Sequence, residues 1–321
     1  MAIEDIVIVV IYFNRILYAE GVSLFMSQKN QPWAGIFLVV IATIALSTEA
    51  IAAKIAYQGG ATVLTTLTVR YVLAVLFFAM MLHSAGTSIK LSLKHTLQAI
   101  GLGIGCQAVT ALSLFNAYRY IPAAMAILLL YVYPTITAIL AYFILKEPLH
   151  WQKWLALVLT STGCVIILGH PQENLHPLGV ALALLAALIN ALFLVLSGKV
   201  LKEIPVPVFN TYLTGSCALL FLGLGSLLGQ LNFNLPLRAW LALLFLSIVC
   251  TVVAMSALLK GVTLIGPSRS AIISTLEPAF TAVLGFFLLS ESLSLWQMIG
   301  GAVILSGVLL QKKEPEVQNN G

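Results

Sequence analysis

The stretch "LYVYPTITAILAYFILKE", from Leu130 to Glu147, returns later in the chain as "ISTLEPAFTAVLGFFLLSE", from Ile273 to Glu291. In both stretches a proline lies inside an apolar run that ends at a glutamate, and Pro134 and Pro278 are 144 residues apart. The same shift superimposes further pairs: Glu147 on Glu291, Leu149 on Leu293, Gly163 on Gly307 and Gly35 on Gly179. A self-match at one fixed offset indicates an internal duplication. Chance similarity between apolar helices is the alternative, but it would not readily align prolines, glutamates and glycines in one register.

The composition places the chain in a lipid bilayer. Of its 321 residues, 60% are hydrophobic and only 8% are charged, whereas soluble domains carry about 25% charged residues. A helix needs about 20 apolar residues to cross the hydrocarbon core. Ten runs of that kind are expected, at residues 33–57, 62–83, 96–117, 122–145, 150–169, 177–200, 206–229, 237–259, 267–289 and 294–311. The predicted fold class is therefore an all-α polytopic membrane protein with ten transmembrane helices.

The ten spans divide into two related halves, residues 33–169 and residues 177–311. Each half holds five spans, so the second copy must enter the membrane in the opposite orientation. Inverted repeats of this kind are typical of secondary transporters, whose binding site lies near the midplane between the repeats. The sequence thus predicts two inverted five-helix repeats.

The ends of the chain lie outside these repeats. In the N-terminal extension, residues 1–32, the run "IVIVVIYF" at residues 6–13 is too short to span a membrane. A short interfacial segment and a true start at Met26 are both open. With the N-terminus inside, 12 of the 16 basic residues fall at cytoplasmic loops or helix ends and 4 fall outside. The positive-inside rule then predicts both termini in the cytoplasm, including the tail at residues 312–321.

The two halves of the chain resemble a known family. Each half closes with a similar string, from Pro134 to Glu147 and then Gly163, and from Pro278 to Glu291 and then Gly307. These strings resemble the drug/metabolite transporter (DMT) superfamily, specifically its EamA-type ten-helix exporters, over about residues 33–311. The resemblance implies proton- or gradient-driven efflux of small metabolites, often amino acids, in a bacterial inner (plasma) membrane. It also implies a central cavity lined largely by the third, fourth, eighth and ninth spans.

The ninth span carries the main candidate for the site. Glu277 lies in an apolar run, where an ionisable side chain costs at least about 2.5 kcal/mol and so marks a functional position. Helical spacing puts Ser270, Ser274 and Thr281 on the face of Glu277. This polar stripe predicts a cavity in which Glu277 contacts substrate or exchanges a proton. A structural carboxylate held by a neighbouring helix is the alternative.

Further candidates lie in spans 1 to 4. The 144-residue register puts Tyr133 in the place of Glu277, so at this position of the repeat only the second half carries an acid. The remaining candidates for the cavity are Tyr131, Thr137, Gln107 and Glu49. For Glu49, a structural ion pair with Arg70 is as good an interpretation, because buried charges are usually paired.

Several other function classes are disfavoured. The chain has no Walker motif, and "GLGIGCQ" at residues 101–107 lacks the dinucleotide-binding spacing, so small residues for close helix packing are expected there. The four cysteines form no CxxC pair and the five histidines have no metal spacing, so we expect no metal, no cofactor and no enzyme activity. The expected partners are a small-molecule substrate and the lipid bilayer, with possible proton coupling and no nucleic acid. A channel, a facilitator and an importer of another metabolite class are the alternatives.

Overall fold

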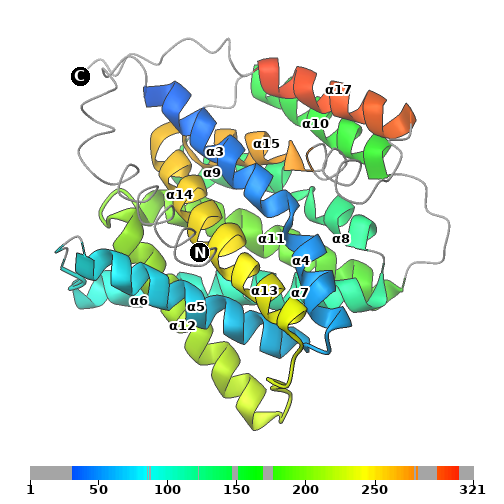
Figure 1. Ribbon diagram of the computed structural model, residues 1–321. Coiled ribbons are helices and arrows are strands. Elements are labelled where there is room, and N and C mark those ends of the chain that lie inside the picture. Colours follow the sequence, from blue (N-terminus) through cyan, green and yellow to red (C-terminus); the bar gives the residue numbers. More distant parts are fainter. Residues whose placement is uncertain are drawn as a thin grey trace.

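The computed structural model describes residues 31–84, 86, 88–121, 123–146, 151–168, 176–277, 280 and 295–310. Within these residues every regular element is a helix (Figure 1). The first half comprises α3 (Gln31–Ser47), α4 (Glu49–Gln58), α5 (Val63–Ser84), α6 (Leu93–Leu102), η2 (Gly103–Ala108), α7 (Val109–Tyr120), α8 (Ala123–Leu130), α9 (Tyr133–Leu145) and α10 (Trp151–Leu168). The second half comprises α11 (Pro177–Val200), α12 (Val206–Leu227), α13 (Leu237–Ser247), η3 (Ile248–Val253), α14 (Ala254–Ile265), α15 (Pro267–Ser274) and α17 (Leu295–Leu310). The segment with Met26 and the tail at 312–321 lie outside the described residues.

The all-α polytopic membrane architecture is confirmed. Among the described residues six helices are long and apolar enough to cross a membrane, namely Pro32–Gln58, Val63–Ser84, Leu93–Tyr120, Pro177–Val200, Val206–Leu227 and Leu237–Ile265. The other predicted spans contain shorter helices, because span 4 is divided into α8 and α9 and span 9 is described only as far as its first turns. Ten membrane-crossing helices therefore stay a prediction.

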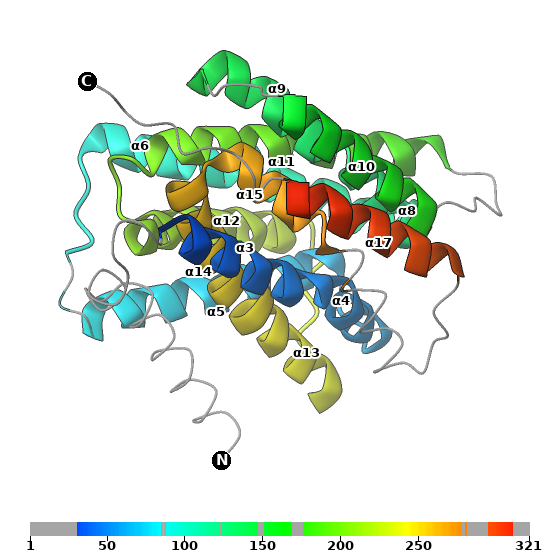
Figure 2. The ribbon, with the colours of Figure 1, turned by 90° about the horizontal axis from the view of Figure 1, so that it is seen from above.

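Helices from the two halves pack in pairs. The last helices of the halves, α10 and α17, lie side by side (Figures 1 and 2). Similarly α5 packs along α12, α3 along α14, and α7 along α11. Each half therefore supplies one side of most helix contacts, and the interior of the molecule lies between the halves.

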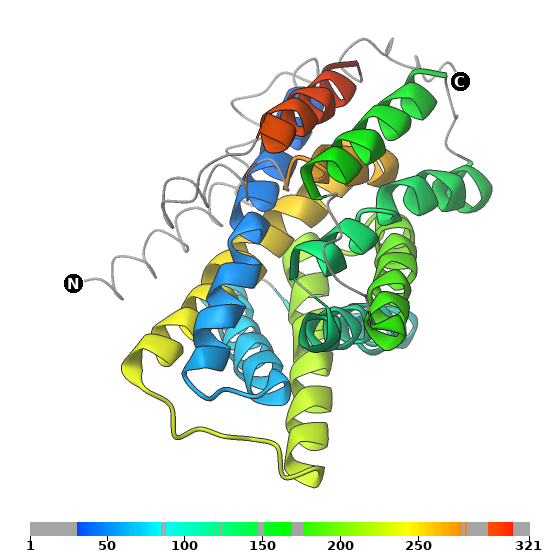
Figure 3. The ribbon, with the colours of Figure 1, turned by 90° about the vertical axis from the view of Figure 1, so that its right-hand side faces the viewer.

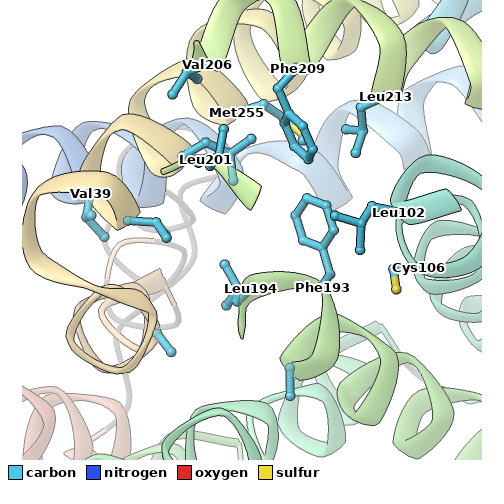
Figure 4. Packing of buried hydrophobic residues seen from close by; sticks show 14 of the residues in the cluster. Val39, Leu102, Cys106, Phe193, Leu194, Leu201, Val206, Phe209, Leu213 and Met255 are labelled. Carbon is cyan, nitrogen blue, oxygen red and sulfur yellow. The ribbon is translucent and has the colours of Figure 1, made fainter. Parts of the chain in front are cut away.

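The main apolar core lies where α6, α11, α12 and α14 meet. Figure 4 shows Phe193 of α11 pointing toward Leu102 of α6 and Phe209 of α12, and all three side chains are buried. Gly103 permits the close approach of α12 to this region, since a Cβ at that position would collide with Ser216 and with the Leu213 carbonyl. Such small residues let membrane helices pack tightly, and this core positions the helices that line the site.

Candidate functional site

A cavity of about 130 Å³ lies at the centre of the molecule. Helices from both halves line it, and its charged and amide-bearing side chains are Glu49, Arg70, Gln107, Asn190 and Glu277. An engineered protein cavity of about 150 Å³ holds one benzene molecule. The cavity therefore has room for a small polar ligand or a few water molecules.

The first helix bends at this cavity. The span is divided at Thr48, whose hydroxyl donates to the Ala45 carbonyl at 2.7 Å, and the thiol of Cys250 donates to the same carbonyl at 3.3 Å. Side-chain hydrogen bonds of this kind offer the helix carbonyl an alternative partner and bend the helix. Glu49 begins the new helix α4 just after the bend, on the cavity wall.

Spans 4 and 9 change course at corresponding positions. Between α8 and α9, the amide of Val132 donates to the carbonyl three residues before it, at 3.3 Å. Between α15 and Glu277, the amide of Leu276, 144 residues after Val132, does the same at 3.0 Å. A proline follows each break in the sequence and has no amide hydrogen to donate. Tyr133 and Glu277, 144 residues apart, are thus the first helical residues after each break, and both line the cavity.

Spans 3 and 8 each contain a π-helical segment, which inserts an extra residue into an α-helix and is frequent at functional sites. The segments are η2 and η3, and their first residues, Gly103 and Ile248, are 145 residues apart. From η2, the Gln107 amide donates to the Tyr71 hydroxyl at 2.9 Å. From η3, the Thr251 hydroxyl accepts a hydrogen bond from Arg70 Nε at 2.7 Å. Two consecutive residues of α5 therefore contact the π-helical segments, Tyr71 at η2 and Arg70 at η3.

Arg70 links three helices at the cavity. Its Nη2 lies 2.8 Å from Glu49 Oε2 and donates a further hydrogen bond to the Cys250 carbonyl at 3.3 Å. The Arg70 side chain is only 4% exposed, whereas that of Glu49 is 16% exposed. The guanidinium also lies over the ring of Phe115, 5.8 Å from its centroid. With these partners Arg70 joins α4, α5 and η3 and neutralises the first of the two cavity carboxylates.

Glu277 supplies the second cavity carboxylate. Its side chain interacts with that of Tyr131, and the negative charge of Glu49 acts on it from the same cavity. Ser274, one turn earlier, also lines the cavity and donates its hydroxyl to the Ser270 carbonyl at 3.0 Å. The wall near Glu277 therefore combines an acid with hydroxyl groups.

The structure brings most of the predicted site residues to the cavity. Glu49, Gln107, Tyr133, Ser274 and Glu277 all line the cavity, and Tyr131 lies behind Glu277, against its carboxyl group.

Two predicted hydroxyl residues are not brought to the cavity wall. Ser270 and Thr137 are fully buried and donate to carbonyls of their own helices, those of Gly266 and Tyr133. The stripe that includes Ser270 stays a prediction; its spacing assumes one unbroken helix, whereas α15 ends at Ser274, before Glu277. Thr281 lies outside the described residues.

The sequence did not point to two residues of the site. Thr251 and Cys250 bind Arg70 from η3. In the 144-residue register they correspond to Gln107 and Cys106, and this correspondence is the signal that could have selected them. A buried arginine alone could have suggested that acceptors face it from another span, but not which ones.

The chain matches a known transporter family in sequence and a solved protein in fold. The model of the EamA-like transporter family matches residues 33–169 and again residues 177–311. The chain is similar to the uncharacterized transporter YcbK of Bacillus subtilis (strain 168), with 28% identity over 287 residues that cover 85% of this chain and 91% of the relative. It is also similar to an uncharacterized transporter of Clostridium kluyveri, with 26% identity over 301 residues that cover 89% of this chain and 95% of the relative. A solved crystal structure has the same fold, with a TM-score of 0.77 and 18% identity. The match covers 87% of this chain and 98% of the chain in that structure.

Proposed function

Because this chain belongs to the EamA-like transporter family, we propose that it is a secondary active transporter that exports amino acids or related small metabolites by alternating access. Its relatives are transporters and not enzymes, and it is itself an integral membrane protein of the DMT superfamily. The substrate class, the direction and the coupling to protons are the parts that we propose. The observation that carries the binding of a small polar substrate is a polar cavity in an apolar helix bundle, where five breaks in helix regularity meet. The direction rests on the resemblance of the two halves to EamA-type exporters.

Those breaks support a binding cavity for a physical reason. Backbone groups freed from a helix must find partners, and within a membrane this is tolerated only where the backbone is buried in protein or lines a water-filled cavity. Secondary transporters place discontinuous helices at their midplane sites for this reason. Here the bend at Thr48, the two π-helical segments and the breaks before Tyr133 and Glu277 all adjoin one cavity.

Several correspondences support the proposal of two inverted repeats, at residues 33–169 and 177–311. The same family model matches both halves. The helix breaks recur after 144 residues and the π-helical segments after 145. Exchanging the halves converts the contact between α3 and α14 into the contact between α11 and α7, and both contacts are present. Ten spans place both termini on the same side, and from the distribution of basic residues we propose that this side is the cytoplasm, at a bacterial inner membrane.

We assign Glu277 the contact with a substrate amine, because Ser274 beside it on the cavity wall adds a hydroxyl group that a lone proton site does not require. Tyr133 takes the corresponding place on the opposite wall. Proton coupling through Glu277 is the second candidate role, and it makes a different prediction.

The test is Glu277→Gln, which removes the charge and keeps the shape. A panel of amino acids in a thermal-stability assay on the purified protein first identifies a ligand. Exchange and gradient-driven uptake of that ligand are then measured side by side in liposomes, together with a melting curve. A substrate contact predicts weaker binding and slower exchange, because a charge-assisted hydrogen bond is about twice as strong as a neutral one.

The other outcomes separate the alternatives. Normal exchange without accumulation against a gradient would assign Glu277 to proton coupling instead. Normal transport with a lower melting temperature would show a structural carboxylate and contradict both proposed roles. Saturable counterflow distinguishes a transporter from a channel, and its absence for every ligand that binds would contradict the transport mechanism.

A further inference from the structure

A second pocket, of about 630 Å³, lies at the other end of α7 from η2. Its walls come from the end of α4, the turn before α5, and the last turns of α7 and α12. Arg119 is the one charged residue that lines it. We propose that this Arg119 pocket is a binding site for a small carboxylate that carries an aliphatic body.

The charge of the pocket selects an anion. Within the described part of the chain, no acidic side chain forms an ion pair with Arg119, whereas Arg70 and Lys94 each have such a partner. Arg119 is exposed at the end of α7 and lines the pocket, so its guanidinium is accessible to a ligand there. A carboxylate can accept charge-assisted hydrogen bonds from this guanidinium, and bonds between ionised groups are the strong ones.

The rest of the lining selects an aliphatic body. Leu64 of α5, Leu112 of α7, and Leu224 and Leu228 of α12 form an apolar wall beside the cation. A single charged group in a mainly apolar concave surface is the usual form of a small-molecule site. An inorganic anion alone would leave this apolar wall without a partner.

The rim of the pocket is rigid. The loop that follows α12 crosses one end of the molecule (Figure 3) and is tied to the turn before α5. Thr62 donates to the Gln230 carbonyl at 2.7 Å, Thr65 accepts from the Asn232 amide at 2.8 Å, and the Asn232 side chain donates to the Gly60 carbonyl at 3.0 Å. A preorganised wall lowers the entropic cost of binding a ligand.

One layer of aromatic side chains separates this pocket from the central cavity. Tyr57 lines the pocket and Phe115 lines the cavity, and their rings meet edge to face with centroids 6.5 Å apart. Tyr118, also on the cavity side, packs against Phe115 at 5.8 Å. The Arg119 pocket is therefore a separate site beside the cavity, and its occupancy does not depend on the proposed transport activity.

Binding of radiolabelled hexanoate to the purified full-length protein in neutral detergent, measured by equilibrium dialysis, tests the proposal. Hexylammonium and 1-hexanol carry the same body without the negative charge. Hexanoate should bind saturably and more tightly than either. Arg119→Gln should weaken hexanoate binding by about tenfold or more, since a hydrogen bond to a charged group contributes about 1.5–3 kcal/mol. Leu224→Trp, which fills the apolar wall, should also weaken it.

Two control variants keep the outcome specific. Arg238→Gln removes another exposed cation that does not line the pocket, and it should leave hexanoate binding unchanged. Glu277→Gln alters only the central cavity and should also leave it unchanged. Arg119 lies in the last turn of α7, where a cation also favours the helix dipole. Occupancy, and not stability, is therefore the measured quantity.

Three results would overturn the inference. Equal binding of hexylammonium would remove the anion selectivity, and hexanoate binding that is lost in Glu277→Gln but kept in Arg119→Gln would place the ligand in the central cavity. Displacement of hexanoate by added phosphatidylglycerol, but not by phosphatidylcholine, would assign the pocket to a lipid headgroup.

Discussion

Removal of the charge on Glu49 is expected to destabilise the protein by about 3 kcal/mol. Glu49→Gln keeps the shape of the side chain but leaves the guanidinium of Arg70 charged in a site where it is 4% exposed. Two unit charges about 4 Å apart attract by about 4 kcal/mol at an effective dielectric constant of about 20. Removing one partner of a buried pair costs about 3–5 kcal/mol. The hydrogen bond from Arg70 to Thr251 at 2.7 Å remains, which favours the lower end of that range.

The measurement is the free energy of unfolding of the purified full-length protein in mixed micelles, by titration with a denaturing detergent and circular dichroism. Arg70→Met and the double variant Glu49→Gln/Arg70→Met complete a double-mutant cycle. The double variant should be more stable, by about 2 kcal/mol, than the sum of the single losses predicts, because it leaves no unpaired charge. Lys54→Gln, an exposed change on the same helix α4, is the matched control and should stay within about 0.5 kcal/mol of wild type.

Additivity would refute this reasoning. If the two single losses sum to the loss of the double variant within about 0.5 kcal/mol, the two charges are not coupled. A Glu49→Gln protein as stable as wild type would show that water in the cavity already screens the pair.

Three smaller changes test other contacts. Gly103→Ala should cost about 1–3 kcal/mol through overpacking against α12, whereas Gly105→Ala, whose Cβ would meet open space, should not; thermal melts compare them. Asn210→Leu should raise the melting temperature, since both polar atoms of this buried amide lack partners among the described residues and an unsatisfied buried group costs about 1–3 kcal/mol. A hydrogen bond from His95 holds the pKa of Glu203 below its usual range, so the pair contributes stability above the ordinary carboxyl pKa and loses it as the pH falls through the lowered pKa. Glu203→Gln should therefore lower the melting temperature slightly at neutral pH and not in acid, and an equal decrease at both would contradict this assignment.

The sequence was most informative where a residue acts on its own backbone. Proline has no amide hydrogen to donate, and the positions of Pro134 and Pro278 in the sequence mark where the helices change course, just before Tyr133 and Glu277. Glu277 could be chosen for the site because a carboxylate in an apolar run is costly wherever it lies. Such local arguments do not depend on which helices become neighbours.

The polar stripe stays a prediction, and its geometry depends on the same place in the chain. Placing Ser270 on the face of Glu277 assumed one continuous helix with a fixed rotation per residue. The i−3 hydrogen bonds at Thr275 and Leu276 tighten the turn between them and change that rotation. A proline predicts that a helix is interrupted, but the angle at which it resumes depends on the helices packed around it.

The π-helical segments were not predictable from their own residues. A π turn inserts one residue and weakens the local hydrogen-bond pattern, so contacts from elsewhere must stabilise it. Here those contacts come from α5, where Tyr71 accepts a hydrogen bond from Gln107 in η2 and Arg70 donates one to Thr251 in η3. In the 144-residue register Ile104 and Cys106 of η2 match Ile248 and Cys250 of η3, but such small and apolar residues are ordinary in a membrane span and do not by themselves indicate a π turn. The common feature is therefore the contact with α5, which only the packed structure makes visible.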